Sequence, residues 1–186
     1  MRLDISGLRF LVVDDNAHMR RIVRTLLHGF GVREVYEAED GASGLEAFQN
    51  VSPDIVIIDW VMPPPDGLEL VKIIRRPDSK LNPYVPIIML TGHSERRRVL
   101  QARDAGVHEF LCKPISAKSL YTRITSIVLH PRQFVRTKDY FGPDRRRFDA
   151  DVAPGGERRK PALPEGTMDI NDIAPKPEPQ PTKVAL

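Results

Sequence analysis

Short apolar runs alternate with amphipathic stretches along the first 130 residues or so of the chain. The clearest run is Asp54-Ile-Val-Ile-Ile-Asp59, in which four β-branched residues lie between two carboxylates, and prolines follow at 63–65. A short apolar run closed in this way predicts a strand that is buried on both faces, as in the parallel sheets of α/β proteins. Similar runs predict four further strands, and the five expected strands are residues 8–13, 32–38, 55–59, 86–90 and 109–112.

Each interval between or after these runs carries apolar residues at helical spacing, which predicts five helices. In the first interval the apolar face is formed by Met19, Ile22, Val23, Leu26 and Leu27. The residue types before three of the helices are those preferred at helix N-caps, and turn or breaker residues follow the helix ends. The predicted caps are Asn16, Ser94 and Ser116, and the predicted stops are Gly31, Pro53, Pro77 and Gly106.

Strict alternation of strands and helices predicts an α/β fold with a five-stranded parallel doubly wound sheet. Crossover connections between parallel strands are right-handed, which places helices on both faces of the sheet. The strand order cannot be deduced from the sequence, but 2-1-3-4-5 is the common order that suits five units of this size.

Polar residues that can take part in chemistry end or directly follow four of the predicted strands: Asp14, Asp15, Asp59, Thr91 and Lys113. Parallel strands end at one edge of a sheet, so these side chains are expected to lie close together. Neighbouring carboxylates cannot all stay ionised without a cation, and hard oxygen ligands with room for water suit Mg²⁺. Asp59 would then act as a nucleophile toward a phosphoryl group, while the metal, Thr91 and Lys113 neutralise the developing charge. The alternative is that each residue merely ends a strand in a turn, but five together favour function.

Composition separates the chain into a globular part and an appendage. The 186 residues suffice for one ordinary domain plus an extension, and 9 of the 17 prolines lie in the last 56 residues. The formal net charge is only +3. No apolar run is long enough for a transmembrane helix, and no signal peptide is apparent. A single cysteine, Cys112, is expected to be a small core residue, and its solitude fits a reducing, cytoplasmic setting.

The motifs at the strand ends carry a family resemblance. Asp14-Asp15, Asp59-Trp-Val-Met-Pro63, Asp66-Gly67, Thr91-Gly92 and Lys113-Pro114 resemble the receiver domain of bacterial response regulators, and the second motif looks closest to CheY. The resemblance implies a signalling protein rather than an enzyme, phosphorylated by a histidine kinase or a phosphotransfer protein.

The same resemblance implies individual roles. Asp59 would be the phospho-acceptor, and the backbone carbonyl of Val61 would join Asp14, Asp15 and Asp59 in the Mg²⁺ site. Thr91 and Lys113 would contact the phosphoryl group, and the Lys113–Pro114 bond would be cis.

Three positions near the site bear on switching and on phosphoryl lifetime: Phe110, Val61 and His93. Thr91 and the aromatic residue Phe110 would form the family's switch pair, although CheY-like proteins usually carry tyrosine in place of Phe110. Val61 and His93 occupy positions that adjust phosphoryl lifetime in the family, and neither is an acid or an amide. A longer-lived phosphate than in a fast chemotaxis regulator is therefore expected. The basic run at 96–98 lies on the expected output surface, although such a run is also typical of a solvated helix face.

Periodicity fades after residue 131, so a largely irregular C-terminal extension is expected. Residues 132–160 contain nine Lys/Arg against five Asp/Glu, and residues 161–186 are Pro-rich. The predicted organisation is a receiver domain at 1–131, an arginine-rich nucleotide-binding extension at 132–160 and a disordered tail at 161–186. The extension has too few apolar residues for a winged helix or a catalytic domain, so a conventional DNA-binding regulator is not expected.

A short cassette occurs twice in this extension, as Gly142-Pro-Asp-Arg-Arg-Arg147 and Gly155-Gly-Glu-Arg-Arg-Lys160. Arginine forks bind phosphate and the guanine edge, and both guanidinium planes and aromatic rings stack on bases. The chemistry suits a ligand with two guanines and two phosphates. The candidate contacts are Asp144, Arg145, Arg146, Arg147, Arg158 and Arg159, with Tyr140, Phe141 and Phe148 as stacking residues.

An arginine-rich extension directly after a CheY-like receiver resembles the Cle group of cyclic di-GMP effectors. That resemblance implies cyclic di-GMP as the ligand, the flagellar motor switch as a partner and recruitment to the flagellar base. The alternatives are a conventional phosphorelay receiver whose tail docks a kinase, another protein or nucleic acid, and a receiver subunit that regulates a separate kinase.

Overall fold

A computed structural model describes residues 3–92, 96–137 and 140–145 of the chain, except for the side chain of Arg96. Strands and helices alternate through the first 129 residues, and two short strands follow. In order the elements are β1 (Arg9–Val13), α1 (Ala17–Gly29), β2 (Glu34–Ala38), α2 (Gly41–Val51), β3 (Ile55–Asp59), α3 (Gly67–Ile74), β4 (Ile87–Thr91), α4 (Arg96–Ala105), β5 (Glu109–Cys112), α5 (Ala117–Leu129), β6 (Phe134–Arg136) and β7 (Phe141–Pro143).

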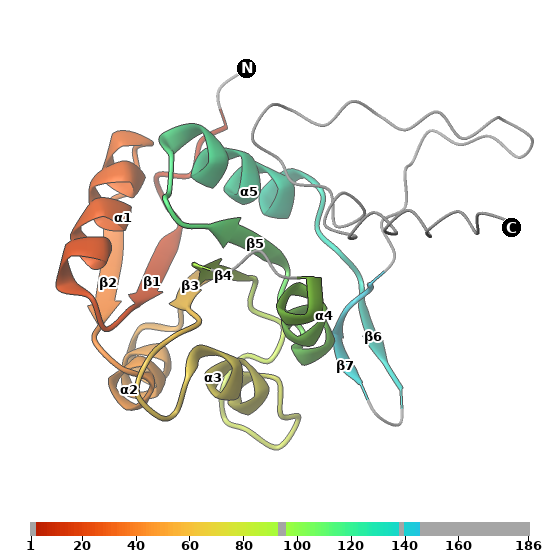
Figure 1. Ribbon diagram of the computed structural model, residues 1–186. Helices are drawn as coiled ribbons and strands as arrows, with labels where there is room; N and C mark the ends of the chain where they lie inside the picture. The colour runs from red at the N-terminus through yellow and green to blue at the C-terminus, as the bar shows by residue number, and fades with distance from the viewer. Residues whose placement is uncertain (1–2, 93–95, 138–139, 146–186) are drawn as a thin grey trace, which may run out of the picture.

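The five strands β1–β5 form one parallel sheet in the order β2-β1-β3-β4-β5, which confirms the predicted fold. Figure 1 shows α1 and α5 over one face of this sheet and α2, α3 and α4 over the other. The register pairs Val13 with Ile58 across β1 and β3, so these neighbouring strands end at nearly the same level. The polar residues that follow them are therefore brought side by side.

The sheet separates two apolar clusters. Alternate residues of each strand point to opposite faces, so Val12 and Ile57 pack toward α1 and α5, whereas Val13 and Ile58 pack toward α2, α3 and α4. The central strand β3 is buried along its whole length. This is why its sequence is a continuous apolar run rather than an alternating one.

Side chains cap the helices where polar residues precede them. Asn16 accepts hydrogen bonds from the amides of His18 and Met19 at the start of α1, and Ser116 forms a reciprocal capping box at α5, both as predicted. The predicted cap Ser94 lies outside the described residues. Asp66 adds a capping box that was not predicted, and it fixes the start of α3 immediately after the β3 loop.

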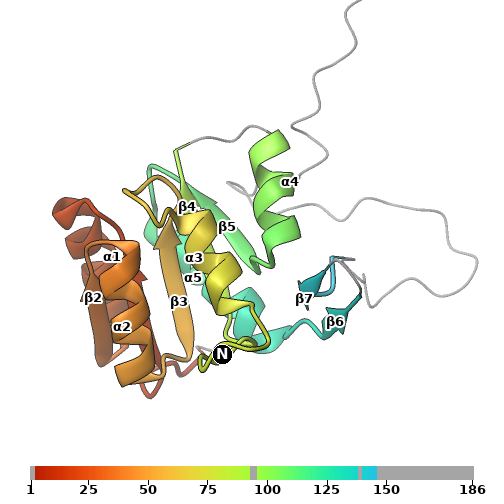
Figure 2. The same cartoon turned by 90° about the horizontal axis from the view of Figure 1, so that it is seen from below.

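An antiparallel hairpin of β6 and β7 follows α5, although the extension was expected to be largely irregular. Aromatic rings attach it to the receiver: the centroid of Phe134 lies 5.0 Å from that of Tyr84, and the centroid of Phe141 lies 5.4 Å from that of Tyr84. Gly142 allows close approach, because a Cβ there would lie 3.0 Å from the Cα of Gly106. Figures 1 and 2 show the hairpin beside the C-terminal end of α4.

Cys112 is exposed, so the expectation that it is a core residue was wrong. It is the last residue of β5, and β5 is an edge strand with a neighbouring strand of the sheet on one side only. Within the described part of the chain, no helix is both long and apolar enough to cross a membrane.

Candidate functional site

Three carboxylates gather where β1 and β3 end. Asp14 and Asp59 are buried and Asp15 is exposed, and one carboxylate oxygen from each lies within 4.8 Å of the others. The backbone amide of Asn16 donates to Asp14 at 2.8 Å, which orients that carboxylate. The sequence-based prediction that these three residues come together is confirmed.

Lys113 closes the cluster from the end of β5. Its Nζ lies 2.9 Å from Oδ1 of Asp59 and 3.1 Å from Oδ2 of Asp14. The Lys113–Pro114 bond is cis, as the family resemblance implied. The backbone amide of Lys113 donates to the carbonyl of Thr91 at 2.8 Å, so the ends of β4 and β5 are held together beside the carboxylates.

The pKa values of Asp59 and Lys113 are both raised, but by different effects. Burial raises the pKa of Asp59 above its ordinary value, and the charge of Asp14 adds to the effect, while the hydrogen bond from Lys113 acts against it. Burial alone would lower the pKa of Lys113, but its hydrogen bonds and the charges of Asp59 and Asp14 outweigh burial and raise that pKa. Lys113 therefore stays cationic, and the side chain of Asp59 has limited solvation.

The backbone around Asp59 is fixed on both sides. The amide of Trp60 donates to Leu90 O at 2.9 Å, and the amide of Gly67 donates to Trp60 O at 3.1 Å. A Cβ at Gly67 would collide with the carbonyl oxygen of Asp59, so only glycine fits there. The position of the Asp59 side chain therefore depends on the start of α3 as well as on β3.

The remaining predicted residues surround this cluster at different depths. Thr91 is buried at the end of β4 and Phe110 is half-buried in β5 beside the apolar cluster under α4. Val61, two residues after Asp59, is 57% exposed. His93 lies outside the described residues. The guanidinium of Arg98 on α4 lies 5.7 Å from the ring centroid of Trp60, which links α4 to the residue after Asp59.

The donor set fits a divalent cation. Two buried carboxylates and one exposed carboxylate supply hard oxygen atoms at one point, with an open side for water. Asp14, Asp15 and Asp59 are the side chains that could hold Mg²⁺. A bound Mg²⁺ would neutralise the carboxylates and the oxygens of an incoming phosphoryl group.

A parallel doubly wound sheet with an acidic pocket and a lysine at its carboxyl edge defines a class of signalling modules, the receivers that bind Mg²⁺ in this pocket. The chain belongs to the response regulator receiver domain family, whose model matches residues 10–125.

The chain is 36% identical over 122 residues to chemotaxis protein CheY-3 of Vibrio cholerae, covering 66% of this chain and 92% of that protein. It is 33% identical over 120 residues to chemotaxis protein CheY of Pseudomonas aeruginosa, covering 64% and 95%. Among solved structures, a putative response regulator from Chloroflexus aurantiacus matches with a TM-score of 0.61 and 29% identity over 66% of this chain and 98% of that one. CheY4 of Vibrio cholerae matches with a TM-score of 0.60 and 29% identity over 65% and 98%.

The predicted nucleotide contacts are only partly within the described residues. Tyr140, Phe141, Asp144 and Arg145 are described and belong to the hairpin or follow it directly, whereas the other predicted contacts lie outside: Arg146, Arg147, Phe148, Arg158 and Arg159. The guanidinium carbon of Arg145 lies 3.8 Å from the ring centroid of Tyr140. Phe141 packs against Tyr84 and Phe134, so its ring is engaged with the receiver.

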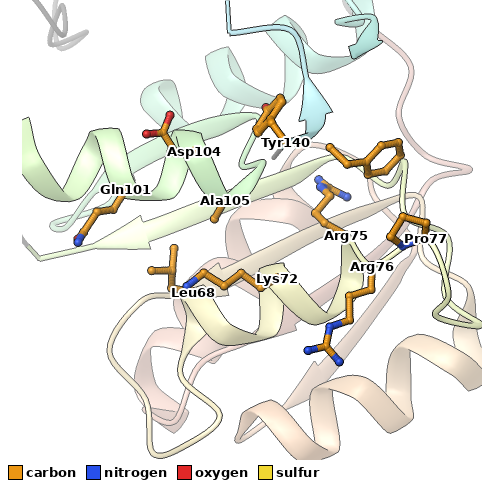
Figure 3. Close-up of a pocket in the computed structure, with 10 residues that line it drawn as sticks. Leu68, Lys72, Arg75, Arg76, Pro77, Gln101, Asp104, Ala105 and Tyr140 are labelled. Atoms are coloured by element: carbon orange, nitrogen blue, oxygen red, sulfur yellow. The ribbon is translucent and has the colours of Figure 1, made fainter. Parts of the chain in front are cut away.

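A buried cation beneath the hairpin was missed by sequence reasoning. Arg75, which ends α3, donates to the carbonyls of Gly106, Pro83 and Val85 at 3.0, 2.7 and 2.8 Å. Burial lowers the pKa of Arg75 to about 9, so it remains charged at neutral pH. Nothing in the sequence around Arg75, two residues before Pro77, distinguishes this buried arginine from its exposed neighbour Arg76, although the two side chains point in different directions (Figure 3).

Proposed function

We propose that the chain is a CheY-like signalling protein without enzymatic output, which binds cyclic di-GMP through its arginine-rich extension and then engages a protein partner such as the flagellar motor switch. The receiver would accept a phosphoryl group on Asp59 from a histidine kinase or a phosphotransfer protein. Its place of action would be the flagellar base. The family membership and the chemotaxis proteins among its relatives support the signalling part of this proposal.

The contact between Lys113 and Asp59 supports the acceptor assignment. An oxygen of the Asp59 carboxylate would attack phosphorus, the bond from phosphorus to the donor nitrogen would break, and its electron pair would stay on the donor imidazole. Lys113 lies at 2.9 Å from that carboxylate and is placed to stabilise the new phosphoryl oxygens. The buried hydroxyl-bearing residue Thr91 lines the same end of the sheet.

Substitution of the acceptor tests this part. Asp59→Asn should abolish labelling by a radioactive small phosphodonor in the presence of Mg²⁺. Asp54→Asn is the matched control, because Asp54 precedes the same strand at its opposite end and pairs there with Arg9. Label retained on Asp59→Asn would overturn the acceptor assignment. A phosphoryl lifetime of seconds on the parent chain would overturn the expectation, drawn from Val61 and His93, that the phosphate is long-lived.

The position of Arg145 carries the nucleotide part of the proposal. Its guanidinium lies on the Tyr140 ring and its Nη1 lies 3.2 Å from Oδ1 of Asp104 on α4. An arginine held between a ring and a carboxylate has lost much of its side-chain freedom before a ligand arrives, which lowers the entropic cost of binding. Arg146 and Arg147 follow directly, so the first cassette begins at an ordered point of the receiver surface.

The proposed stacking residue is Tyr140 rather than Phe141. Phe141 serves to attach the hairpin, since its ring contacts Tyr84 and Phe134. Tyr140 donates its hydroxyl proton to Pro143 O at 2.6 Å, which holds its ring in place. Tyr140 with Arg145 is therefore the proposed platform for a base, and Phe141 supports it from the receiver side.

Calorimetry tests the ligand assignment. The full chain is titrated with cyclic di-GMP, GMP and ATP, and the series is repeated with Arg146→Ala and with Arg136→Ala, a control that removes an exposed arginine of β6. Heat with cyclic di-GMP that is lost in Arg146→Ala and kept in Arg136→Ala supports the proposal. A dissociation constant for cyclic di-GMP weaker than about 100 µM, which corresponds to a binding free energy of roughly 5–6 kcal/mol, overturns the proposal. Binding of any DNA with a steep salt dependence would favour the nucleic-acid alternative.

A further inference from the structure

The carbonyl of Asp14 lies just beyond the point where β1 and β2 stop pairing. The parallel register of these strands ends at Val13 and Ala38, and the amide of Asp14 donates to the carbonyl of Ala38 at 3.2 Å. The carbonyl of Asp14 belongs to the next peptide, although the residue is completely buried. Because a buried carbonyl without a donor destabilises a fold, this position needs a donor from a side chain.

Arg20 supplies that donor from the first turn of α1. Its Nη1 donates to the carbonyl oxygen of Asp14 at 2.7 Å, and its Nε donates to Oε2 of Glu37 on β2 at 3.3 Å. The side chain of Arg20 is only 14% exposed. A guanidinium carries five donors in a rigid plane, so it can hold a carbonyl and a carboxylate at the same time.

Glu37 fixes the orientation of Arg20 and neutralises its charge. The register pairs Glu37 with Val12, which places it beside β1 two residues before Asp14. Its second carboxylate oxygen, Oε1, lies 2.8 Å from Nη1 of Arg24, one turn further along α1. Both oxygens of Glu37 are therefore engaged, and Arg20 is held from two sides.

The contact from Arg20 completes the fixation of Asp14. Oδ1 of Asp14 accepts from the amide of Asn16 at 2.8 Å, and Oδ2 accepts from Nζ of Lys113 at 3.1 Å. With its amide bound to β2 and its carbonyl bound to Arg20, each polar group of Asp14 has a partner. The orientation of this residue is thus specified at both its side chain and its backbone.

The same contact also determines where Asp15 lies. A peptide unit is planar, so the carbonyl oxygen of Asp14 and the Cα of Asp15 are in one plane. Arg20 holds that oxygen and thereby sets the direction in which Asp15 leaves the strand. Asp15 is exposed, yet one of its carboxylate oxygens lies within 4.8 Å of oxygens from the two buried carboxylates. Its place in the cluster therefore depends on the backbone that Arg20 orients.

We propose that Arg20 is a positioning residue of the acidic site, which sets the affinity of that site for a divalent cation by holding the peptide between Asp14 and Asp15. Arg20 acts through the backbone and takes no part in bond making at Asp59. The inference rests on the proposed function, because the cation serves phosphoryl transfer to Asp59. Residues that orient metal ligands from outside typically change affinity by about 10- to 100-fold when they are replaced.

The sign of the effect separates positioning from charge. Arg20→Met removes the guanidinium and keeps most of the alkyl stem that packs beside β2. Removal of a positive charge near the carboxylates would by itself tighten the binding of Mg²⁺. Loss of the hydrogen bond to Asp14 should weaken binding, because the cation would then have to order the Asp14–Asp15 peptide itself. We expect the second effect to prevail, since Glu37 already neutralises the charge of Arg20.

A Mg²⁺ titration of the full chain at constant ionic strength measures this sign. The single tryptophan, Trp60, directly follows Asp59, so its fluorescence reports cation binding. Arg20→Met should bind Mg²⁺ about tenfold more weakly than the parent chain. Arg20→Lys should weaken binding by about threefold, because one ammonium cannot reproduce the fork that holds both Asp14 and Glu37.

Two further arginines of α1 provide the controls. Arg21 is the exposed neighbour of Arg20, and Arg21→Met should bind Mg²⁺ within about twofold of the parent chain, because an exposed charge is screened. Arg24→Met removes an ion pair with the same Glu37 but no contact with Asp14, so it should weaken binding by less than about threefold. Urea unfolding midpoints show that each variant is folded under the conditions of the titration.

The Mg²⁺ dependence of labelling gives a second measurement. With a small phosphodonor at low Mg²⁺, Arg20→Met should be labelled about tenfold more slowly than the parent chain, in proportion to its weaker cation binding. At saturating Mg²⁺ its labelling rate should return to within about twofold of the parent rate, because uniform weakening of binding is overcome by concentration. A tenfold defect that persists at saturating Mg²⁺ would overturn the positioning role.

The outcomes distinguish this inference from the proposed function. Binding of Mg²⁺ by Arg20→Met that equals or exceeds that of the parent chain overturns the inference, as does equal weakening by Arg20→Met and Arg24→Met or a parent chain that does not bind Mg²⁺. In the first two cases the proposed function stands if Asp59 is labelled. If Arg20→Met weakens Mg²⁺ binding as expected but the parent chain is not labelled at Asp59, the acceptor assignment fails and the role of Arg20 stands.

Discussion

Acidification should destabilise the junction between the receiver and its hairpin, because His108 is buried there as a neutral ring. Its Nδ1 accepts hydrogen bonds from the amide of Ile87 at 3.2 Å and from Arg75 at 3.3 Å. Its ring centroid lies 5.5 Å from that of Phe134 in the hairpin. Protonation at Nδ1 would remove the acceptor for both donors and would place a second cation against Arg75.

The size of the effect follows from the pKa of this histidine. Burial, followed by the charges of Arg75 and Arg132, lowers the pKa of His108 from 6.5 to about 3. Between these two values the unfolded chain binds a proton that the folded chain does not, so stability falls as the pH falls below about 6.5. At pH 5.0, which is about 1.5 pH units below the pKa of the unfolded histidine, protonation of the unfolded chain lowers the free energy of unfolding by about 2 kcal/mol relative to pH 7.5.

Urea unfolding at the two pH values measures this loss, and two variants separate His108 from other titrating groups. His108→Asn keeps an acceptor near the position of Nδ1 but cannot be protonated, so its stability should change by about 2 kcal/mol less than that of the parent chain between pH 7.5 and 5.0. His18→Asn removes an exposed histidine of α1 and should behave like the parent chain. Equal pH dependence of the parent and His108→Asn would refute the reasoning, because the neutral state of His108 would then not be coupled to folding.

Three further predictions concern the carboxylate cluster and the hairpin. Gly67→Ala should slow labelling of Asp59 by a small phosphodonor at least tenfold, since the new Cβ collides with the Asp59 carbonyl; a labelling rate equal to the parent's would contradict the close contact. Lys113→Gln should bind Mg²⁺ several-fold more tightly, because a cation that competes at the carboxylates is removed; a Mg²⁺ titration followed by Trp60 fluorescence measures this, and weaker binding would contradict it. Phe134→Ala should destabilise the chain by about 1–3 kcal/mol in urea unfolding, which is less than for a fully buried ring because Phe134 is half-buried. The same variant should make the hairpin more susceptible to limited proteolysis. Unchanged resistance to the protease would show that the ring contacts of Phe134 do not hold the hairpin on the receiver.

The hairpin gives the extension a structural relation to the receiver. Glu109 is buried at the start of β5, and its carboxylate lies 3.1 Å from Arg123 of α5 and 3.3 Å from Arg132 at the start of the extension. Together with the Phe134 contacts, this pair attaches the extension at the end of the sheet opposite the carboxylate cluster. Figure 2 shows that the C-terminal end of α4 lies beside the hairpin.

Local patterns of the sequence were sufficient for most of the receiver. The run Ile55–Asp59 was predicted as a buried strand because burial on both faces leaves no polar position, and the topology of parallel strands then required Asp14, Asp59 and Lys113 to meet. Cys112 shows the limit of such reasoning: its apolar neighbours suggested a core position, whereas its exposure depends on which elements cover the end of an edge strand.

What the sequence determined by itself was therefore the order of the elements and the residues at the strand ends, since both follow from periodicity and from the shared edge of a parallel sheet. Only the tertiary structure decided the role of Arg75, His108 and the hairpin. Arg75 bonds to Gly106 and His108, which are 31 and 33 positions away in the sequence, and the two strands of the hairpin have three residues each. Such short strands have no resolvable period, and a buried cation is distinguished from an exposed one only by the carbonyls and rings that the fold places around it.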